Sequence, residues 1–372
     1  MIDIKKAPKL GFGLMRLPEK DGQIDYGRVN KMVDAYLEAG LNYFDTAYVY
    51  HGGRSEVAVR ECLVKRHPRE SFTVATKLPA WSIFSPEDRD RIFNEQLERT
   101  GAGYFDYYLL HSIEPNNYVT YEKYNCFEWG LEKKKQGLIK HLGFSFHGTP
   151  ELLEEVLDKH PETEFVQIQL NYLDWNDPVI QSSALYDILS SRNIPIIIME
   201  PVKGGTLAKL TPECASVFDA VTGGRSAASW ALRFVASLPG VMTILSGMST
   251  EEQVEDNLKT FGGDYVLSEE EQAAVTKVRA IMKNIPLIGC TSCRYCTDGC
   301  PMSINIPDVF KAVNAKRLDP NAWRPKNFYI AATDGKGKAS ECIECGQCEG
   351  VCPQHLDIID RLKEAVSLFE QE

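Results

Sequence analysis

The sequence predicts an α/β protein of two domains, a (β/α)8 TIM barrel over residues 1–286 and a small, mainly helical domain over residues 287–372. Two observations support this prediction. Through the first 285 residues, short apolar runs alternate with amphipathic segments, which is the pattern of parallel βα units. Near the C-terminus, eight of the eleven cysteines lie in two short runs, and a separate metal-binding domain explains this density.

Eight apolar runs are expected to form the strands of the barrel. They are Lys9–Gly13, Tyr43–Thr46, Phe72–Thr76, Phe105–Leu110, His141–Phe144, Phe165–Leu170, Pro195–Met199 and Met242–Leu245. Each run precedes a segment of helical periodicity, in order Tyr26–Ala39, Glu56–Lys65, Pro86–Thr100, Tyr121–Lys135, Pro150–Asp158, Pro178–Ser190, Ser226–Ala236 and Thr250–Leu258. Eight units in about 260 residues are typical of a (β/α)8 barrel, whose functional site lies at the C-terminal strand ends. An open doubly wound sheet is the alternative.

Two further features complete the first domain. Gly11-x-Gly13 does not continue into a dinucleotide-binding fingerprint, because Arg16 occupies the third glycine position and no helix opens directly after it. A last helix, Ser268–Lys283, is expected outside the barrel. The domain boundary is placed near Pro286.

The two cysteine runs share the spacing Cys-x2-Cys-x2-Cys-x3-Cys-Pro, which is typical of [4Fe-4S] clusters. In two-cluster proteins the fourth cysteine of each run binds the other cluster. We therefore assign Cys352 to the cluster of the first run and Cys300 to the cluster of the second. The alternative is a pair of zinc sites, but these usually use two separated Cys-x2-Cys pairs per ion. The two predicted ligand sets are Cys290, Cys293, Cys296 and Cys352, and Cys342, Cys345, Cys348 and Cys300.

The 41 residues between the runs are longer than the link of a compact bacterial ferredoxin. Helices are expected at Ile306–Arg317 and, after the second run, at Ile358–Phe369. The segment resembles the helical two-cluster ferredoxin domains that are attached to many redox enzymes, so this ferredoxin-like domain should contain little strand. The three other cysteines, Cys62, Cys126 and Cys214, are expected to pack as ordinary apolar side chains.

The composition excludes several classes of protein. The formal net charge is -11 and no stripe of Lys and Arg is present, so a nucleic-acid partner is not expected. The N-terminal residues have no apolar signal segment, and no window reaches the roughly 18 apolar residues that a membrane span needs. We expect a cytoplasmic protein without a membrane partner, in which the cysteines bind metal and do not form disulfides.

Four ionisable side chains lie at or just beyond the ends of expected strands: Asp45, Tyr50, Lys77 and His111. In a barrel these positions meet at one mouth. Taken singly, Asp45 has a simpler explanation as a helix cap, Lys77 as an exposed loop residue and His111 as a buried core histidine. Together the four residues match one chemical use, the transfer of hydride to or from a carbonyl carbon.

Each member of this group of four has a distinct role in that reaction. A carbonyl that accepts hydride gains negative charge on oxygen, and Tyr50 donates the proton if a cation lowers the phenol pKa of about 10. Lys77 is the candidate cation, and Asp45 keeps it charged and oriented. His111 donates a hydrogen bond to the substrate oxygen or shares the proton relay, as a neutral or a charged ring. In the oxidation direction the tyrosinate is the base.

The residues around this group resemble the aldo-keto reductase family. The resemblance covers nearly all of residues 5–285, and it rests on segments 42–50, 52–56, 75–77, 110–111, 143–145 and 167–171. The family has a (β/α)8 barrel, uses NADPH or NADH without a metal, and has an Asp, Tyr, Lys and His tetrad at the positions of Asp45, Tyr50, Lys77 and His111. The resemblance also implies roles in nucleotide binding: the nicotinamide carboxamide for Ser145 and Gln167, and the end of the adenosine-binding segment for Asp256 and Asn257.

The sequence departs from the family pattern at three places. Phe146-His147 follows Ser145, where the family usually has Asn. The seventh strand ends in Met199-Glu200, where the family often has an aromatic ring on the nicotinamide, so Met199 or Glu200 must serve differently. Where NADPH-using members have Lys and Arg against the 2′-phosphate, this chain has Ser246-Gly-Met-Ser249 and Gln253, which favours NADH unless Lys203 or Lys259 compensates.

The order of the two domains resembles a bacterial and archaeal branch of aldo-keto reductases with a ferredoxin-type domain. Nicotinamide transfers two electrons and a cluster transfers one, so a flavin normally connects them, and the sequence has no flavin fingerprint. Three interpretations remain open. In the first, the barrel interconverts a small-molecule carbonyl and alcohol, and the clusters are structural or redox-sensing. In the second, the clusters pass electrons to a redox partner protein. In the third, the barrel binds nicotinamide without turnover and acts as a sensor. The complete tetrad argues against the third, because a barrel that only binds nicotinamide has no need of Tyr50 and Lys77 together.

Overall fold

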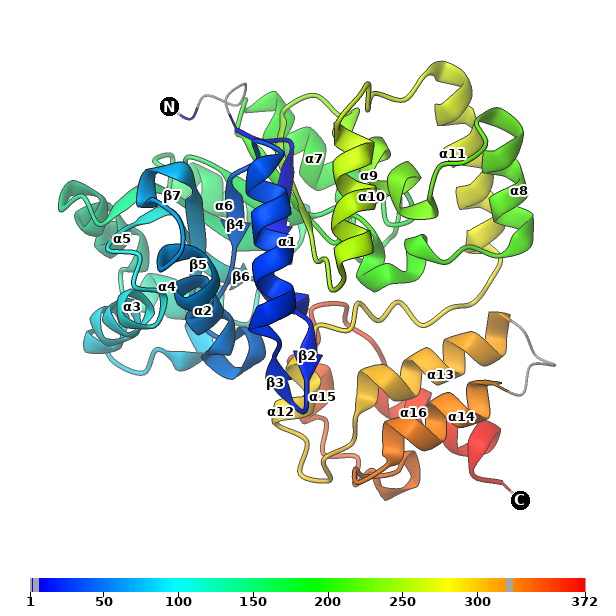
Figure 1. Ribbon diagram of the computed structural model, residues 1–372. Helices are drawn as coiled ribbons and strands as arrows, with labels where there is room; N and C mark the ends of the chain where they lie inside the picture. The colour runs from blue at the N-terminus through cyan, green and yellow to red at the C-terminus, as the bar shows by residue number, and fades with distance from the viewer. Residues whose placement is uncertain (1, 3–6, 319–323, 372) are drawn as a thin grey trace. The chain divides into compact units, whose positions relative to one another are not determined.

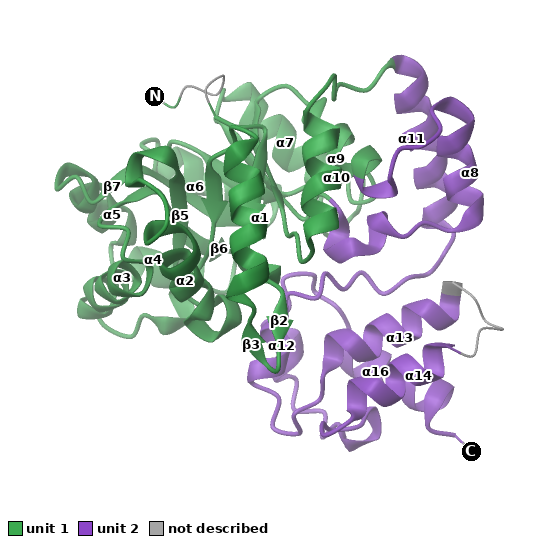
Figure 2. Cartoon of the chain, viewed as in Figure 1, with its two compact units in different colours: residues 1–201, 229–268 green, residues 202–228, 269–372 purple. Residues whose placement is uncertain are grey.

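The computed structural model describes residues 2, 7–318 and 324–371 (Figure 1). The chain forms two compact units (Figure 2), the first with residues 1–201 and 229–268 and the second with residues 202–228 and 269–372. The second unit thus contains the predicted C-terminal domain together with residues 202–228 and 269–286, and the boundary near Pro286 stays a prediction. Within the described ranges, no helix has the length and apolar character that a membrane crossing requires.

Eight parallel strands form a closed barrel, in the order β1-β10-β9-β8-β7-β6-β5-β4. This closure confirms the predicted (β/α)8 fold and excludes the open sheet. Every predicted strand is present, with ends that differ by up to three residues because the hydrogen-bonded ladder extends beyond some apolar runs. The strands are β1 (Leu10–Gly13), β4 (Tyr43–Asp45), β5 (Thr73–Pro79), β6 (Phe105–Ile113), β7 (Ile139–Phe146), β8 (Val166–Gln169), β9 (Ile196–Met199) and β10 (Val241–Ser246).

Helices follow the strands as predicted, with two local differences. The predicted helix Tyr121–Lys135 is divided by Asn125, whose left-handed φ of 47° interrupts the helical backbone. The predicted helix Pro178–Ser190 begins only after Gln181, which has a φ of 50°. The observed helices are α1 (Tyr26–Glu38), α2 (Arg54–Val59) with a π-helical turn (Arg60–Val64), α3 (Glu87–Thr100), α4 (Tyr118–Lys123), α5 (Cys126–Lys135), α6 (Pro150–Lys159), α7 (Ser182–Ser191), α9 (Ala227–Ala236) and α10 (Glu251–Phe261).

The sequence prediction missed a short hairpin after the first strand, formed by β2 (Glu19–Lys20) and β3 (Gln23–Ile24). Its two-residue loop is Asp21-Gly22, and both residues have positive φ angles, of 53° and 73°. An Asp-Gly pair with this backbone is the commonest signal for a tight hairpin, so the signal was present in the sequence.

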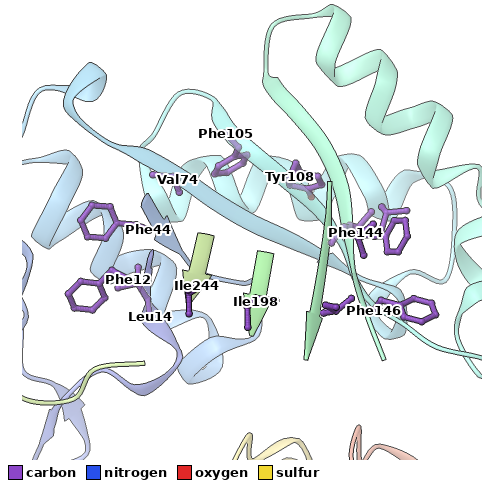
Figure 3. Close-up of a cluster of buried hydrophobic side chains, with 14 of the residues drawn as sticks. Phe12, Leu14, Phe44, Val74, Phe105, Tyr108, Phe144, Phe146, Ile198 and Ile244 are labelled. Carbon is purple, nitrogen blue, oxygen red and sulfur yellow. The ribbon is translucent and has the colours of Figure 1, made fainter. Parts of the chain in front are cut away.

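The barrel strands bury both of their faces. Phe44, Val74 and Tyr108 pack in the layer between strands and helices (Figure 3), whereas their neighbours Tyr43, Ala75 and Tyr107 belong to a separate cluster of buried side chains. This alternation follows from the two-residue period of a strand. Each large side chain that is fully buried contributes roughly 1.5–3 kcal/mol to folding.

Gly143 in β7 shows how closely the strands pack. A Cβ atom at this position would lie 2.3 Å from the carbonyl oxygen of Phe165, which is a backbone atom that cannot move aside. Only glycine fits here without displacing the segment that leads into β8.

The second unit is helical, as predicted for the C-terminal domain. Its helices are α8 (Pro212–Val221), α11 (Glu269–Lys283), α12 (Tyr295–Asp298), α13 (Ile306–Leu318), α14 (Arg324–Thr333), α15 (Gln347–Gly350) and α16 (Ile358–Phe369). Val313, Tyr329 and Leu362 belong to the core between α13, α14 and α16, and the ring of Tyr329 stacks on Phe369 at 5.0 Å. Within the described part of this unit, the β-structure is one isolated bridge between Ile304 and Gly337. Four of these helices were not predicted from the sequence: α8, α12, α14 and α15.

Candidate active site and cluster-binding sites

The structure brings the four candidate catalytic residues together. Asp45 ends β4, Lys77 lies in β5, His111 lies in β6, and Tyr50 begins a short turn after β4. The Lys77 ammonium donates hydrogen bonds to Asp45 Oδ1 at 2.5 Å, to the Thr46 carbonyl at 2.7 Å and to the Tyr50 hydroxyl at 3.4 Å. All three donors of the ammonium are therefore used, one of them on the phenol oxygen.

The histidine completes this group from a third strand. The rings of His111 and Tyr50 meet edge to face, with centroids 6.1 Å apart. The next residue, Ser112, has a left-handed φ of 59°, and its strand has a bulge between Leu110 and Ile113. A non-glycine residue with this backbone is strained, and such strain is common where a side chain must be aimed at a site.

Burial controls the charges in this group, because every member is at most 9% exposed. Burial lowers the pKa of Lys77, and the carboxylates of Asp45 and Glu56 oppose that effect. Burial also raises the pKa of Asp45, and Lys77 opposes it. For His111, burial and then the charge of Lys77 lower the pKa well below the ordinary value. This shift favours the neutral imidazole, one of the two protonation states considered from the sequence.

The turn that positions Tyr50 is held by residues that sequence reasoning missed. His51, Gly52 and Gly53 all have left-handed φ angles, of 52°, 62° and 86°. The ring of His51 accepts the backbone N–H of Leu17 at 3.2 Å through Nε2, and its Nδ1 lies 2.9 Å from the carboxylate of Glu19 in the hairpin. The hairpin thereby fixes the strained turn that presents the phenol.

A second network lies behind Lys77 and involves the start of α2. The hydroxyls of Ser55 and Thr46 are 2.7 Å apart, and the fully buried carboxylate of Glu56 accepts hydrogen bonds from Thr76 at 2.7 Å and Gln96 at 3.0 Å. Gln96 also donates to the carbonyl of Lys77 at 3.0 Å. These contacts fix the two threonines that adjoin the ion pair. Glu56 lies in segment 52–56, which carries part of the family resemblance, whereas Gln96 on α3 had no signal in the sequence.

The candidate nicotinamide-binding residues lie at the ends of adjacent strands. Ser145 in β7 is the register partner of Gln167 in β8, and Ser145 Oγ accepts the backbone N–H of Ser112 at 2.7 Å. Gln167 Nε2 lies 3.5 Å from the sulfur of Met199 in β9. Its Oε1 is buried and has no hydrogen-bond partner in the described part of the chain. A buried amide oxygen in this state fits a ligand that donates an N–H, as a carboxamide does.

The candidate adenosine-binding residues lie on α10. Asn257 is buried and donates to the Ser246 hydroxyl at the end of β10, at 2.7 Å. Its neighbour Asp256 is half-buried, and its backbone carbonyl accepts the hydroxyl of Thr260. The structure therefore brings Asn257 into contact with the end of a barrel strand.

The start of α10 carries negative charge. Thr250 caps the helix, Glu251 and Glu252 occupy its first turn, and Glu251 forms a two-pronged ion pair with Arg28. Arg16, which the sequence marked only as the residue that breaks the glycine motif, pairs with Glu200 at 3.0 Å. An added Cβ at Gly247 would lie 3.3 Å from the Arg16 guanidinium, so this cation lies beside the segment 246–249.

The eight candidate cluster ligands line two cavities in the second unit, four in each. In each cavity the fourth cysteine comes from the other run, so Cys352 faces the first cavity and Cys300 the second. In the described residues, no group of three or more His, Cys, Asp or Glu side chains is placed to hold a single metal ion. Four thiols around one space fit a cubane cluster. The sets are Cys290, Cys293, Cys296 and Cys352, and Cys300, Cys342, Cys345 and Cys348.

The three remaining cysteines are buried in the described structure, at Cys62, Cys126 and Cys214. Burial raises the pKa of Cys62 and of Cys126 to about 12, so both are protonated at neutral pH. This agrees with the predicted packing role.

Comparison with known proteins matches residues 9–280 to the Aldo/keto reductase family and residues 289–357 to a 4Fe-4S dicluster domain. The chain belongs to the aldo/keto reductase family. It is therefore an oxidoreductase, and the resemblance inferred from the sequence is confirmed for both parts of the chain. The two matched segments lie on either side of Pro286.

Relatives of this aldo/keto reductase match its barrel. An aldo-keto reductase of Mycolicibacterium paratuberculosis is 28% identical over 73% of this chain and 86% of its own length. L-galactose dehydrogenase of Arabidopsis thaliana is 26% identical over 74% of this chain and 92% of its own. Among solved structures, the holo form of a Bacillus halodurans aldo-keto reductase has a TM-score of 0.60 and 24% identity, covering 73% of this chain and 91% of its own. A Klebsiella pneumoniae aldo/keto reductase in complex with NADP and acetate has a TM-score of 0.60 and 20% identity, covering 73% and 92%.

Proposed function

We propose that this aldo/keto reductase interconverts a small-molecule carbonyl compound and its alcohol, with Tyr50 as the general acid and base. The observation that supports this most strongly is the buried chain of contacts from Asp45 through Lys77 to the Tyr50 hydroxyl. A barrel that only binds nicotinamide needs no buried cation on a phenol oxygen. When bound, a nicotinamide nucleotide supplies or accepts the hydride.

The proton moves at the Tyr50 hydroxyl. In the reduction direction the phenol donates its proton to the substrate oxygen as negative charge develops there, and the adjacent Lys77 ammonium stabilises the tyrosinate that results. In the oxidation direction the same tyrosinate removes the alcohol proton. Asp45 orients the ammonium for both directions, because it accepts one of its three hydrogen bonds.

His111 orients the substrate as a neutral ring. A neutral imidazole carries one N–H, so it donates one hydrogen bond to the substrate oxygen and adds no second positive charge beside Lys77. The ring of Trp81 lies 5.2 Å from the His111 ring and is 44% exposed. We infer that Trp81 contacts the substrate from the open side of the site.

The nicotinamide carboxamide is assigned to Ser145 and Gln167. The buried Oε1 of Gln167 accepts a hydrogen bond from the carboxamide N–H. The adjacent Ser145 Oγ accepts a hydrogen bond from the Ser112 backbone N–H, so the Ser145 O–H is available to donate to the ligand. Met199 contacts Gln167 and takes the place of the usual aromatic ring as a polarizable apolar surface. Asn257 and Asp256 are assigned to the adenosine end.

We propose NAD(H) as the preferred cofactor over NADP(H). Glu251 and Glu252 place two carboxylates in the first turn of α10, where a 2′-phosphate would be repelled. The nearby cations are already paired, Arg28 with Glu251 and Arg16 with Glu200. The Klebsiella pneumoniae structure contains NADP, so the preference must be measured on this chain.

The two cavities are assigned to [4Fe-4S] clusters with crossed ligands. Cys296 belongs to the core of the helical part of the second unit and five more of the eight cysteines pack against it, so cluster binding would complete that core. This favours a structural contribution. A role in electron transfer to a redox partner is the second candidate, because Cys345 is exposed and its neighbour Ile343 is 61% exposed.

The function is tested on anaerobically prepared protein that retains its iron. Carbonyls and alcohols are screened with NADH and with NADPH, and iron content and cluster absorbance are measured on the same sample. Turnover that disappears in Tyr50→Phe supports the proposal. Bound nicotinamide without turnover of any substrate class would favour the sensor interpretation.

A further inference from the structure

The segment that begins the second unit has an unusual backbone. Lys203, Gly204 and Gly205 follow one another with left-handed φ angles of 47°, 61° and 96°. Glycine adopts this conformation readily, but lysine does so rarely. A strained lysine that is only 8% exposed needs a structural or functional reason.

This segment packs directly on the first cysteine run. An added Cβ at Gly204 would lie 2.7 Å from the backbone of Thr291, so the two backbones are in close contact. The ammonium of Lys203 lies 3.8 Å from the Cβ position of Gly289, the residue before Cys290. The left-handed backbone thus places a buried cation beside the loop that carries the first ligand.

The charges around the two cavities differ. The first cavity has Arg294 in its lining, and Lys203 lies beside its loop. The second cavity has no charged side chain in its described lining. Its cysteine run carries Glu344 and Glu349 next to two of the ligands, Cys345 and Cys348, and Glu344 pairs with Lys363 at 3.0 Å.

Charge near an iron–sulfur cluster affects its reduction potential. Reduction by one electron adds one negative charge to the cluster, and a cation in a poorly solvated position stabilises that state more than a solvent-exposed one does. Arg294 pairs with Asp308 at 3.0 Å and is exposed, so part of its effect is cancelled or screened. Lys203 is 8% exposed, so solvent screens its charge less than that of Arg294.

We propose that Lys203 raises the reduction potential of the cluster bound by the first run above that of the second, so that the first cluster is reduced first. This inference rests on the two clusters of the proposed function. It assigns Lys203 to electrostatic tuning of the cluster and not to the adenosine 2′-phosphate.

The test is a redox titration of the full chain with its iron, with dithionite as the one-electron donor and electron paramagnetic resonance as the readout. Lys203→Met removes the charge and keeps an unbranched apolar stem. Lys203→Asn also removes the charge, and asparagine tolerates the left-handed backbone. This second variant therefore keeps the test valid if Lys203→Met fails to fold. Lys203→Arg keeps the charge, and Lys209→Met removes the same charge from an exposed position six residues away. Cys293→Ser identifies which signal belongs to the first cluster.

The wild type should show two separate reduction steps, with the first cluster at the higher potential. Lys203→Met and Lys203→Asn should lower that step alone, whereas Lys203→Arg and Lys209→Met should leave both steps in place. Unchanged potentials in both neutral variants, or equal shifts of both clusters, overturn the proposal. So does weaker NADPH binding with an unchanged potential, because it assigns Lys203 to the nucleotide. A wild-type protein without iron or a cluster signal instead refutes the cluster assignment itself.

Discussion

Removal of the cation beside Tyr50 should change the pH at which the enzyme oxidises an alcohol. Lys77→Met alone would leave the buried Asp45 carboxylate without its partner, a change that costs about 3–5 kcal/mol of stability for buried pairs. We therefore consider Lys77→Met combined with Asp45→Asn, which removes both charges and keeps both shapes approximately.

The size of the expected shift in the Tyr50 pKa follows from the distance of 3.4 Å between Lys77 Nζ and the Tyr50 hydroxyl. At this distance the attraction between an ammonium and a tyrosinate is about 5 kcal/mol for an effective dielectric constant near 20, and about 1 kcal/mol in water. Each 1.36 kcal/mol of this attraction changes the pKa of the phenol by about one unit. The Asp45 carboxylate opposes part of the attraction, so we expect a shift of about one to three pH units.

The assay is the pH dependence of kcat/KM for alcohol oxidation, whose rising limb reports deprotonation of the base in the free enzyme. Loss of the cation disfavours the tyrosinate, so this limb should move to higher pH in the double variant. Lys65→Met, which removes a lysine charge from an exposed position, is the matched control and should leave the limb unchanged. Nicotinamide binding, followed by protein fluorescence, shows that the variant site is still folded. A slower variant with an unshifted limb would refute the role of Lys77.

Three further outcomes are expected. Tyr50→Phe should lower kcat for carbonyl reduction about 10²–10⁴-fold while nicotinamide binding persists, and turnover near the wild-type rate in a substrate assay would contradict the proposed acid. Cys300→Ser should damage the cluster of the second run, seen as lost iron and a lost paramagnetic signal; damage confined to the first cluster would contradict the crossed ligands. Glu252→Lys should raise the ratio of kcat/KM for NADPH to that for NADH several-fold, since it replaces a repulsive charge without breaking the Arg28–Glu251 pair, and an unchanged ratio would place the 2′-phosphate elsewhere.

The elements that the sequence predicted best are those with a strong local pattern. Each barrel strand is buried on both faces, so it reads as a short continuous apolar run between turn residues, and each helix has an apolar stripe. The tetrad could be predicted for a related reason. Strand ends converge in a barrel, so Asp45, Lys77 and His111 are neighbours once the strands are placed.

The residues that sequence reasoning missed act through contacts between distant segments. Gln96 belongs to an ordinary amphipathic helix, and nothing in its local sequence indicates that its amide reaches the carbonyl of Lys77. His51 and Glu19 meet only because a hairpin brings Glu19 onto the turn. Arg16 was noted solely as a residue that breaks a glycine motif, whereas the structure pairs it with Glu200. Such pairings depend on tertiary structure and have no periodic signal.

The clusters of the second unit could serve to stabilise the fold, to transfer electrons, or both. Its small helical core includes the side chains of Cys290, Cys300, Cys342, Cys348 and Cys352 at its edge, and small domains commonly need a metal to supply stability that their limited apolar core cannot. A structural role alone would therefore be enough to account for cluster binding. A tuned potential is not explained in this way, because a purely structural cluster gains nothing from a strained, buried lysine beside its ligand loop. The charge of Lys203 thus separates the two interpretations of the clusters: if it sets the potential, the clusters exchange electrons as well as stabilise the fold.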